Sequence, residues 1–204
     1  IVLGCIKAKV KVQSSSADLL QEVTNYCEEM KESMVVSDIA KQASIKDTRK
    51  AYRQLGKDPT RYRSAAEALA RRILKGQDLY RVNNVVDINN LISLQSLYPV
   101  CAYDFNKVDG PITMVRAQEG AVYSGIGRGE INIEFLPVFK DVQGYFGSTT
   151  SDSERAMISK ETQHILMFIV SFNGKEQLKP YVESMKKLLE RYAEGKNIET
   201  RIIE

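Results

Sequence analysis

A chain of 204 residues is long enough for one large domain, or for two small ones, with a sizeable buried core. Its 43% hydrophobic and 27% charged residues are close to globular averages, which excludes disordered, collagen-like and coiled-coil proteins. No apolar run approaches the roughly 18 residues that a membrane span needs. Three widely spaced cysteines (Cys5, Cys27 and Cys101) fit a reducing compartment better than a disulfide framework, so we expect a cytoplasmic protein without a membrane partner.

The chain has one histidine, His164, which excludes any site that needs two imidazoles from one chain. His164 precedes a strongly apolar run, so we interpret it as the first residue of a strand rather than as a general base. No CxxC, HxxxH or HExxH motif is present. The sequence therefore predicts neither a metal site nor a cofactor.

The N-terminal part predicts one strand and two helices. In the second half of residues 2–12, apolar residues alternate with lysines, which predicts a half-buried strand over this range. Ser14, Ser15 and Ser16 precede a run of helical spacing from Leu19 to Met30, which indicates a capped helix. A second helix is expected over residues 37–55, ending at Gly56. This helix places four basic residues on one face: Lys46, Arg49, Lys50 and Arg53.

A third helix is predicted between Ser64, which forms a capping-box pattern with Glu67, and Gly76. Its last turn carries three cations that the helix dipole stabilises: Arg71, Arg72 and Lys75. In the loop before it, Arg61 and Arg63 flank Tyr62. This arrangement fits either stacking and pairing on a nucleotide or packing of Tyr62 against the helix.

Positive charge is concentrated in one segment. Residues 46–81 contain eleven Lys or Arg and four Asp or Glu, a net charge of +7, so the rest of the chain sums to −4. A local excess of this size is typical of a surface that binds phosphates, although a solvated helix face would have the same composition. We expect tRNA or another RNA as the partner, with Arg61, Arg63, Arg71, Arg72 and Lys75 in contact with it, and see no sign of DNA specificity.

The remainder predicts a mixed α/β protein. A helix begins near Asn84 and contains an unusual number of asparagines, whose hydrogen bonds at a cap or a site must offset their low helix propensity. Five strands are expected over residues 100–103, 112–115, 121–123, 131–133 and 165–172, followed by a helix over 175–193 and a strand over 200–203. No linker or repeat divides the chain.

Two glycine-containing segments have alternative interpretations. Residues 124–129 read SGIGRG, which lacks the spacing of a phosphate loop and predicts a hairpin turn. Residues 146–155 read FGSTTSDSER and form a dense polar loop whose backbone amides are candidates for holding an anion. Asp152 and Glu154 in this loop are two carboxylates without further metal ligands, and Arg155 is expected to pair locally.

Residues 81–120, which contain NNVVD and then DFNKVDG, resemble the B3/B4 module of the bacterial phenylalanyl-tRNA synthetase beta chain. The resemblance spans about residues 59–172. It implies a layered, sandwich-like α/β domain that associates with RNA, with an editing pocket for tyrosine mischarged onto the phenylalanine tRNA. We expect one such domain over residues 1–204: an N-terminal strand and helices to residue 58, the B3/B4-like core over 59–172, and a C-terminal helix and strand over 173–204.

Three positions depart from the family pattern. Asn89 stands where the family has threonine, Cys101 where it has histidine, and Phe168 where it has the glutamate that recognises the tyrosine hydroxyl. Because Phe168 offers no polar partner to a phenol, we expect a pocket at this position to favour an apolar or small aminoacyl group over tyrosine.

An aminoacyl ester is activated, so a positioned water is sufficient to hydrolyse it. The candidate catalytic residues are Asn84, Asn89 and Cys101, the last as a possible thiol nucleophile, with Phe168, Gly147, Ser148 and Thr149 as substrate-binding residues. The leading hypothesis is a tRNA-binding protein that acts as an aminoacyl-tRNA deacylase and does not aminoacylate. The alternatives are a non-catalytic RNA-binding module and an amino-acid-binding protein or small-molecule hydrolase.

Overall fold

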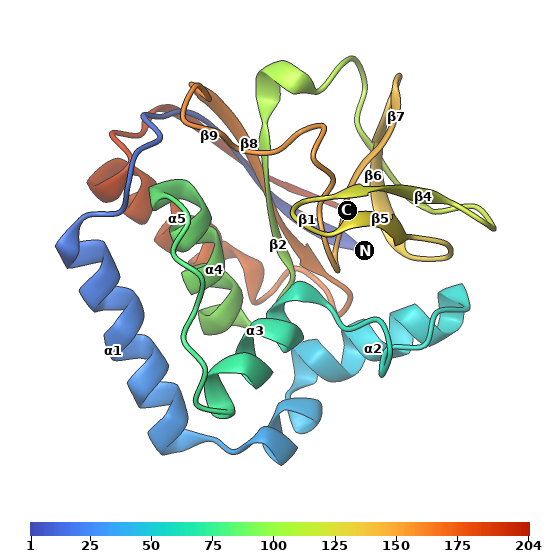
Figure 1. Ribbon diagram of the computed structural model, residues 1–204, viewed down its shortest axis with the longest axis horizontal. Helices are drawn as coiled ribbons and strands as arrows, with labels where there is room; N and C mark the ends of the chain where they lie inside the picture. The colour runs from blue at the N-terminus through green and yellow to red at the C-terminus, as the bar shows by residue number, and fades with distance from the viewer.

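The computed structural model describes all 204 residues, and its centre is a four-stranded antiparallel sheet of order β2-β8-β1-β9. The strands are β1 (Val2–Lys9), β2 (Val100–Asp104), β8 (His164–Ser171) and β9 (Lys196–Ile203). The two terminal strands, β1 and β9, are neighbours, so the ends of the chain lie close together (Figure 1). β8 is buried along almost its whole length because both of its faces are covered.

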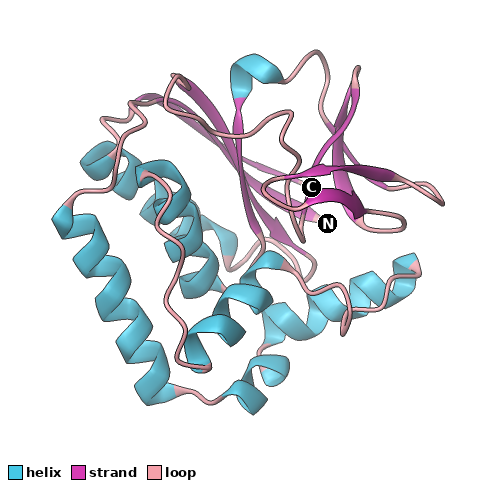
Figure 2. Ribbon diagram, in the orientation of Figure 1, coloured by secondary structure: helices cyan, strands magenta, loops and turns pink.

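Helices cover one face of this sheet (Figure 2). They are α1 (Ala17–Ser33), the 3-10 helix η1 (Val36–Lys41), α3 (Ala65–Leu74), α4 (Asn84–Ser96) and α5 (Leu178–Tyr192). Helix α2 (Ala43–Leu55) follows η1 and extends toward the smaller strands, where its Tyr52 is buried in a separate core. Helices α4 and α5 pack on each other and on the sheet, with α1 and α3 outside α4. Together with the sheet they enclose the main core of 30 buried residues.

Smaller β elements cover the opposite face. The strands β3 (Thr113–Arg116), β6 (Pro137–Asp141) and β7 (Gly144–Ser148) form a second antiparallel sheet, and β4 (Val122–Gly125) pairs with β5 (Gly129–Asn132). A single turn of 3-10 helix, η2 (Phe105–Lys107), follows β2. Aromatic side chains fill the space between the two sheets: Tyr103, Phe139, Phe146 and Phe168. The layered α/β architecture expected from the sequence is confirmed.

Local signals placed most elements correctly. Ser16 caps α1 by accepting a hydrogen bond from the amide of Leu19, and Ser64 caps α3 in the same way through Glu67. Gly56 ends α2 in the left-handed conformation, with a φ of 91°. The hairpin expected at residues 124–129 joins β4 to β5, and β8 begins at His164 as predicted.

Three expectations about elements were wrong. The helix expected over 37–55 is divided into η1 and α2 at Gln42, whose backbone is extended. The first strand ends at Lys9 rather than Val12. Strands β6 and β7 were not anticipated: Val138 and Phe139 are both buried, one in each of two separate cores, so β6 has no apolar-polar alternation.

Candidate functional site

The largest cavity, about 550 Å³, lies beside the β2 edge of the main sheet. Its walls come from α3, α4, the turn between β4 and β5, and the polar loop that follows β7. Apolar side chains line much of the wall, including Leu69, Val86, Val100, Ala102 and Ile158. A volume of this size accommodates a small organic group such as an aminoacyl moiety.

Asp152 is the only acidic residue that lines this cavity. Its Oδ1 accepts hydrogen bonds from the Tyr103 hydroxyl at 2.7 Å and from the Ser148 amide at 3.2 Å, whereas no protein group donates to Oδ2. Burial raises the pKa of Asp152 to about 7, although the two hydrogen bonds oppose this shift. A carboxylate with a free oxygen and a pKa near neutrality has the properties of a general base.

Gly147 has a steric role in this arrangement. A Cβ atom at position 147 would lie 1.9 Å from the Tyr103 hydroxyl oxygen, so only glycine lets the phenol pass and reach Asp152. The Tyr103 ring is fully buried and packs edge-on against Phe146, with ring centroids 4.8 Å apart. Gly147 therefore acts through Tyr103, and not as the anion-binding amide that the sequence suggested.

The polar loop itself is tightly hydrogen bonded. The Ser148 hydroxyl donates to the carbonyl of Ser151 and accepts from the amides of Thr150 and Ser151. The buried Thr149 hydroxyl lies 2.5 Å from the hydroxyl of Tyr52, and its amide donates to the carbonyl of Pro137. The amides of Ser148 and Thr149 thus both have protein partners. Neither is free to hold an anion, contrary to the expectation from the sequence.

The turn between β4 and β5 holds the loop from the other side. The Ile126 amide donates to the carbonyl of Asp152 at 3.2 Å, and the Glu154 amide donates to the carbonyl of Ser124 at 3.0 Å. These bonds position Arg128, at the tip of the turn, on the wall of the cavity that contains Asp152. The carboxylate and this guanidinium come from segments that approach each other only through tertiary structure.

Of the candidate catalytic residues, Asn89 lines the cavity and Asn84 does not. Asn89 projects from α4, and its amide oxygen is buried without a hydrogen-bond partner. Asn84 is fully buried and hydrogen bonds to four backbone groups: the amides of Gln13 and Val85 and the carbonyls of Lys11 and Tyr192. Asn84 therefore fixes the start of α4 and has no capacity left for a substrate.

Four of the five predicted RNA-binding residues line the same cavity: Arg63, Arg71, Arg72 and Lys75. Arg71 donates to the buried carboxylate of Glu67, and Arg72 binds the carbonyl of Asp78 and lies over the ring of Tyr80. Lys75 and Arg128 have no hydrogen-bond or ion-pair partner, and Arg63 comes only within 3.9 Å of Glu67. The cationic groups with the fewest internal contacts at the cavity are therefore Arg63, Lys75 and Arg128, and Arg72 adds a positive charge that no carboxylate pairs.

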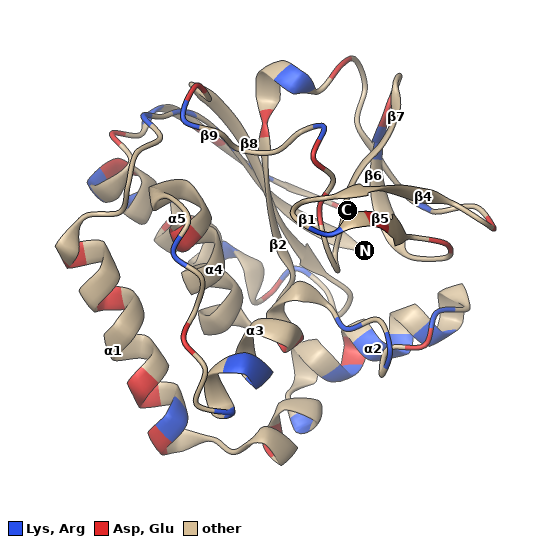
Figure 3. Cartoon of the chain, viewed as in Figure 1, with Lys and Arg blue, Asp and Glu red and all other residues tan.

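Arg61 lines a neighbouring cavity of about 420 Å³, which shares Arg63, Arg128 and Thr150 with the larger one. Tyr62 is half-buried and packs against a small apolar core, and the Lys57 ammonium lies 3.8 Å from its ring centroid. Tyr62 therefore packs, but against this core and not against α3 as the sequence suggested, and it also lines the same cavity as Arg61. Basic residues also lie along α2 and at the end of α3 (Figure 3).

Cys101 and Phe168 lie on the other face of the sheet, away from Asn89. They are opposite one another on β2 and β8, and Phe168 stacks on Phe139 with centroids 4.4 Å apart. Burial raises the pKa of the Cys101 thiol well above its usual value, and a nearby Asp152 charge adds to this shift, so the thiol stays protonated and is a poor nucleophile. The expected convergence of these three residues is not found.

Phe168 does line a separate cavity of about 450 Å³ between the two sheets. The walls are largely apolar, with Lys7, Glu199 and Arg201 among the residues that line it. Phe168, at the family-matched position, also packs into the aromatic cluster.

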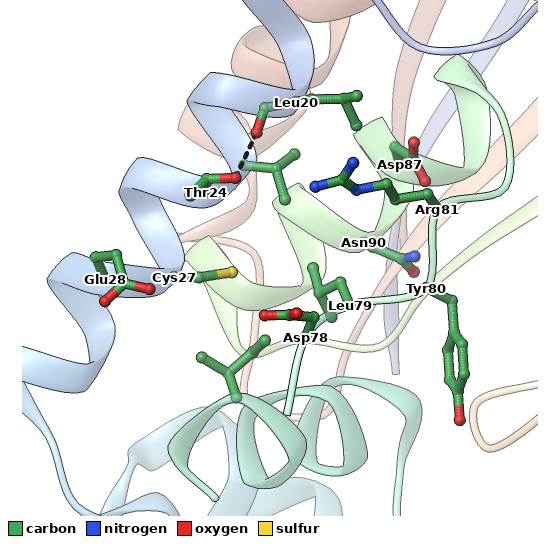
Figure 4. A pocket seen from close by; sticks show the side chains of 12 residues that line it. Leu20, Thr24, Cys27, Glu28, Asp78, Leu79, Tyr80, Arg81, Asp87 and Asn90 are labelled. Carbon is green, nitrogen blue, oxygen red and sulfur yellow. Dashed lines mark hydrogen bonds between the residues drawn. The ribbon is translucent and has the colours of Figure 1, made fainter. Parts of the chain in front are cut away.

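Two further hollows border the basic region. One, of about 310 Å³, lies against α2 and is lined by Asp47, Lys50 and Phe172. The other is a crevice of about 60 Å³ between α1 and the segment that precedes α4 (Figure 4). The crevice is lined by residues that include Cys27, Asp78 and Asp87. The Asp87 carboxylate already accepts hydrogen bonds from the Ser15 hydroxyl and the Val82 amide. The volume of this crevice holds water molecules and no larger group. No cluster of three histidine, cysteine, aspartate or glutamate side chains suitable for a metal ion is found.

The sequence did not indicate three residues of the site as functional candidates: Tyr103, Arg128 and Asp152. The sequence placed Asp152 in a polar loop and considered it only as a metal ligand, and it placed Arg128 in a turn. Tyr103 looked like an ordinary strand residue. Their signal is weak because each belongs to a different element, and only the hydrogen bonds described above bring them together.

Comparisons with known proteins agree with this architecture. The family described as the B3/4 domain matches residues 47–196, more than half of the chain. The crystal structure of an N-terminal fragment of the phenylalanyl-tRNA synthetase beta-subunit from Pyrococcus horikoshii has a similar fold, with a TM-score of 0.50 at 14% sequence identity. The match covers 97% of this chain and 46% of that fragment. No curated protein matches the chain. No helix has the length and apolar character needed to cross a bilayer.

Proposed function

The chain belongs to the B3/4 domain family, and from this membership we propose that it binds tRNA and hydrolyses the ester of a mischarged aminoacyl-tRNA. The observation that carries the proposal is the position of Asp152, a carboxylate with a pKa near 7, in a cavity whose other charged residues are all basic. The cations attract the phosphates of an RNA end, and the apolar wall accommodates the aminoacyl side chain.

In the proposed reaction, the free Oδ2 of Asp152 removes a proton from a water molecule as that water attacks the ester carbonyl carbon. The tetrahedral intermediate collapses with cleavage of the bond to the ribose oxygen. The proton held by Asp152 then passes to this leaving oxygen, so that a free amino acid and a tRNA with an intact ribose hydroxyl are formed. Asn89 lines the same cavity and is available to orient the water or the aminoacyl group.

A non-catalytic RNA-binding module is the second candidate. The observation that favours it is the packing of Cys101 and Phe168, at the family-matched pocket positions, into an aromatic cluster on the opposite face of the sheet from Asn89. In that case the cations around the cavity would carry the function alone, and Asp152 would contribute only to the folding of its loop.

The test is a deacylation assay with a panel of mischarged aminoacyl-tRNAs, comparing the native protein with Asp152→Asn. We expect the native protein to hydrolyse at least one ester faster than buffer, and Asp152→Asn to lower that rate by about 10²–10⁴-fold, as for other general bases. Glu154→Gln is the matched control, since this exposed carboxylate is two residues away and does not line the cavity.

The outcomes separate the candidates. RNA binding without hydrolysis of any ester would support the non-catalytic module. Binding of neither tRNA nor its esters would contradict both and favour an amino-acid-binding protein. Equal losses in Asp152→Asn and Glu154→Gln, with both variants folded, would remove Asp152 from the catalytic role.

A further inference from the structure

The main sheet has one covered edge and one open edge. Beyond β2, the amide of Asp104 donates to the carbonyl of Ala156, and the loop after β7 lies against the strand. Within residues 1–204 no strand pairs with the outer side of β9, and the backbone of residues 196–203 makes no hydrogen bond outside its ladder with β1. An uncovered strand with unpaired amides and carbonyls is a template for another strand.

The side chains of β9 divide between two faces. Thr200 is opposite Ile6 and Ile202 is opposite Gly4, so both lie on the face that the helices cover. Glu199 and Arg201 lie on the other face, beside the cavity between the sheets. Neither charged side chain has an ion-pair partner within the chain, and Ile202 and Ile203 are 38% and 48% exposed.

We propose that two copies of the protein associate through β9, antiparallel, about a two-fold axis at Thr200, to form a continuous eight-stranded sheet. The axis must be perpendicular to the sheet, which keeps every side chain on its own face and places one residue opposite its own copy. With the axis at Thr200, Glu199 of each copy lies opposite Arg201 of the other, which gives two opposite-charge pairs. Ile198 of each copy likewise lies opposite Ile202 of the other.

Neighbouring registers are unfavourable. An axis at Arg201 would oppose two guanidinium groups, and an axis at Glu199 would oppose two carboxylates, which destabilises a strand pair. An axis at Ile202 would set Arg201 against Ile203 and leave its charge unpaired. Only the register centred on Thr200 combines two opposite-charge pairs, two aliphatic pairs and a threonine pair.

This proposal does not depend on the enzymatic activity proposed above, because β9 contributes no residue to the cavity that contains Asp152. The charges also explain why the interaction would be selective. The edge accepts its own sequence in one register, whereas an unrelated strand would leave Glu199 and Arg201 unpaired.

The test is a charge exchange followed by sedimentation velocity over a concentration series. Glu199→Arg and Arg201→Glu, each alone, replace both opposite-charge pairs by like-charge pairs and should raise the dimer dissociation constant about tenfold or more. The double variant Glu199→Arg with Arg201→Glu restores complementarity and should dimerise like the native protein. Mixing the two single variants should produce a heterodimer, since each then faces the opposite charge.

Glu32→Arg is the matched control, because it makes the same charge change on the outer face of α1. Circular dichroism verifies that all variants are folded. A native protein that stays monomeric up to its solubility limit would overturn the proposal, as would a dimer whose dissociation constant is the same in both single variants and the native chain. A heterodimer formed only on mixing would establish the register.

Discussion

The position of the Asp152 carboxylate depends on two buried residues, Tyr103 and Gly147. Tyr103 donates a hydrogen bond to Oδ1 and none to Oδ2, and Gly147 provides the space through which the phenol reaches the carboxylate. We therefore regard Tyr103 and Gly147 as positioning residues. Their effect on the reaction is expected through the charge state and orientation of Asp152, and not through contact with the ester.

The first prediction at this scale concerns pH. A general base works when deprotonated, so the enzyme-dependent deacylation rate should rise with pH through about 7 and then level off. Tyr103→Phe removes a hydrogen bond to the charged carboxylate, which favours the protonated form and should move this rise to higher pH. The measurement is kcat/KM against pH, after subtraction of spontaneous hydrolysis.

Tyr98→Phe serves as the control, because the Tyr98 hydroxyl donates to Asn173, which does not line the cavity. A Tyr103→Phe profile that loses amplitude at every pH but keeps its midpoint would indicate a structural role only. The same midpoint in Tyr98→Phe and the native protein is expected.

Among the elements, the start of α4 shows how one side chain joins distant parts of the chain. Asn83 caps the helix through the amide of Val86, whereas the neighbouring Asn84 connects the segment after β1 and the end of α5 to the helix. This accounts for the first two of the four asparagines in this segment, Asn83 and Asn84. It also explains why Asn84, expected in a substrate pocket, is instead buried in the structure.

The prediction at the element scale compares two neighbouring substitutions. Asn84→Ala leaves buried amides and carbonyls without partners and should lower the free energy of unfolding by about 2–4 kcal/mol. Asn83→Ala removes a helix cap alone and should cost about 1 kcal/mol. Chemical denaturation followed by circular dichroism measures both. Equal, small losses would mean that water replaces the Asn84 hydrogen bonds.

In the whole molecule, positive charge from three separate segments meets at one cavity. Arg63 precedes α3, Lys75 follows it, and Arg128 comes from the turn between β4 and β5. Arg71 is less available because it is paired with the fully buried carboxylate of Glu67, which also binds Arg49. Reversing Arg71 would place two carboxylates together and damage the fold before it tested RNA binding.

The prediction for the whole molecule is therefore made on the free cations. The triple variant Arg63→Glu, Lys75→Glu and Arg128→Glu should bind tRNA much more weakly, and its affinity should depend less on salt, the slope of log K against log salt falling by about 2. The control reverses three exposed lysines outside the cavity: Lys140, Lys160 and Lys187. Filter binding over a salt series compares the two, and equal losses would show that only net charge matters.

The sequence alone determined the mixed α/β class, most helices and strands, the caps at Ser16 and Ser64, and the family. These follow from periodicity, capping and local motifs, which depend on residues close together in the chain. It also selected Arg63, Lys75 and Asn89 as candidate site residues, because a concentration of charge or a family motif is visible in the linear sequence, and all three line the largest cavity.

Only the tertiary structure decided which of these residues share a site. Adjacent positions on β2 face opposite sides of the sheet, so Ala102 lines the cavity with Asn89, whereas Cys101 joins Phe168 in the aromatic cluster. Asp152, Tyr103 and Arg128 meet through hydrogen bonds between segments that are far apart in the chain or joined by a turn. The elevated pKa of Asp152 arises from burial, and burial is a property of the folded chain that no local pattern encodes.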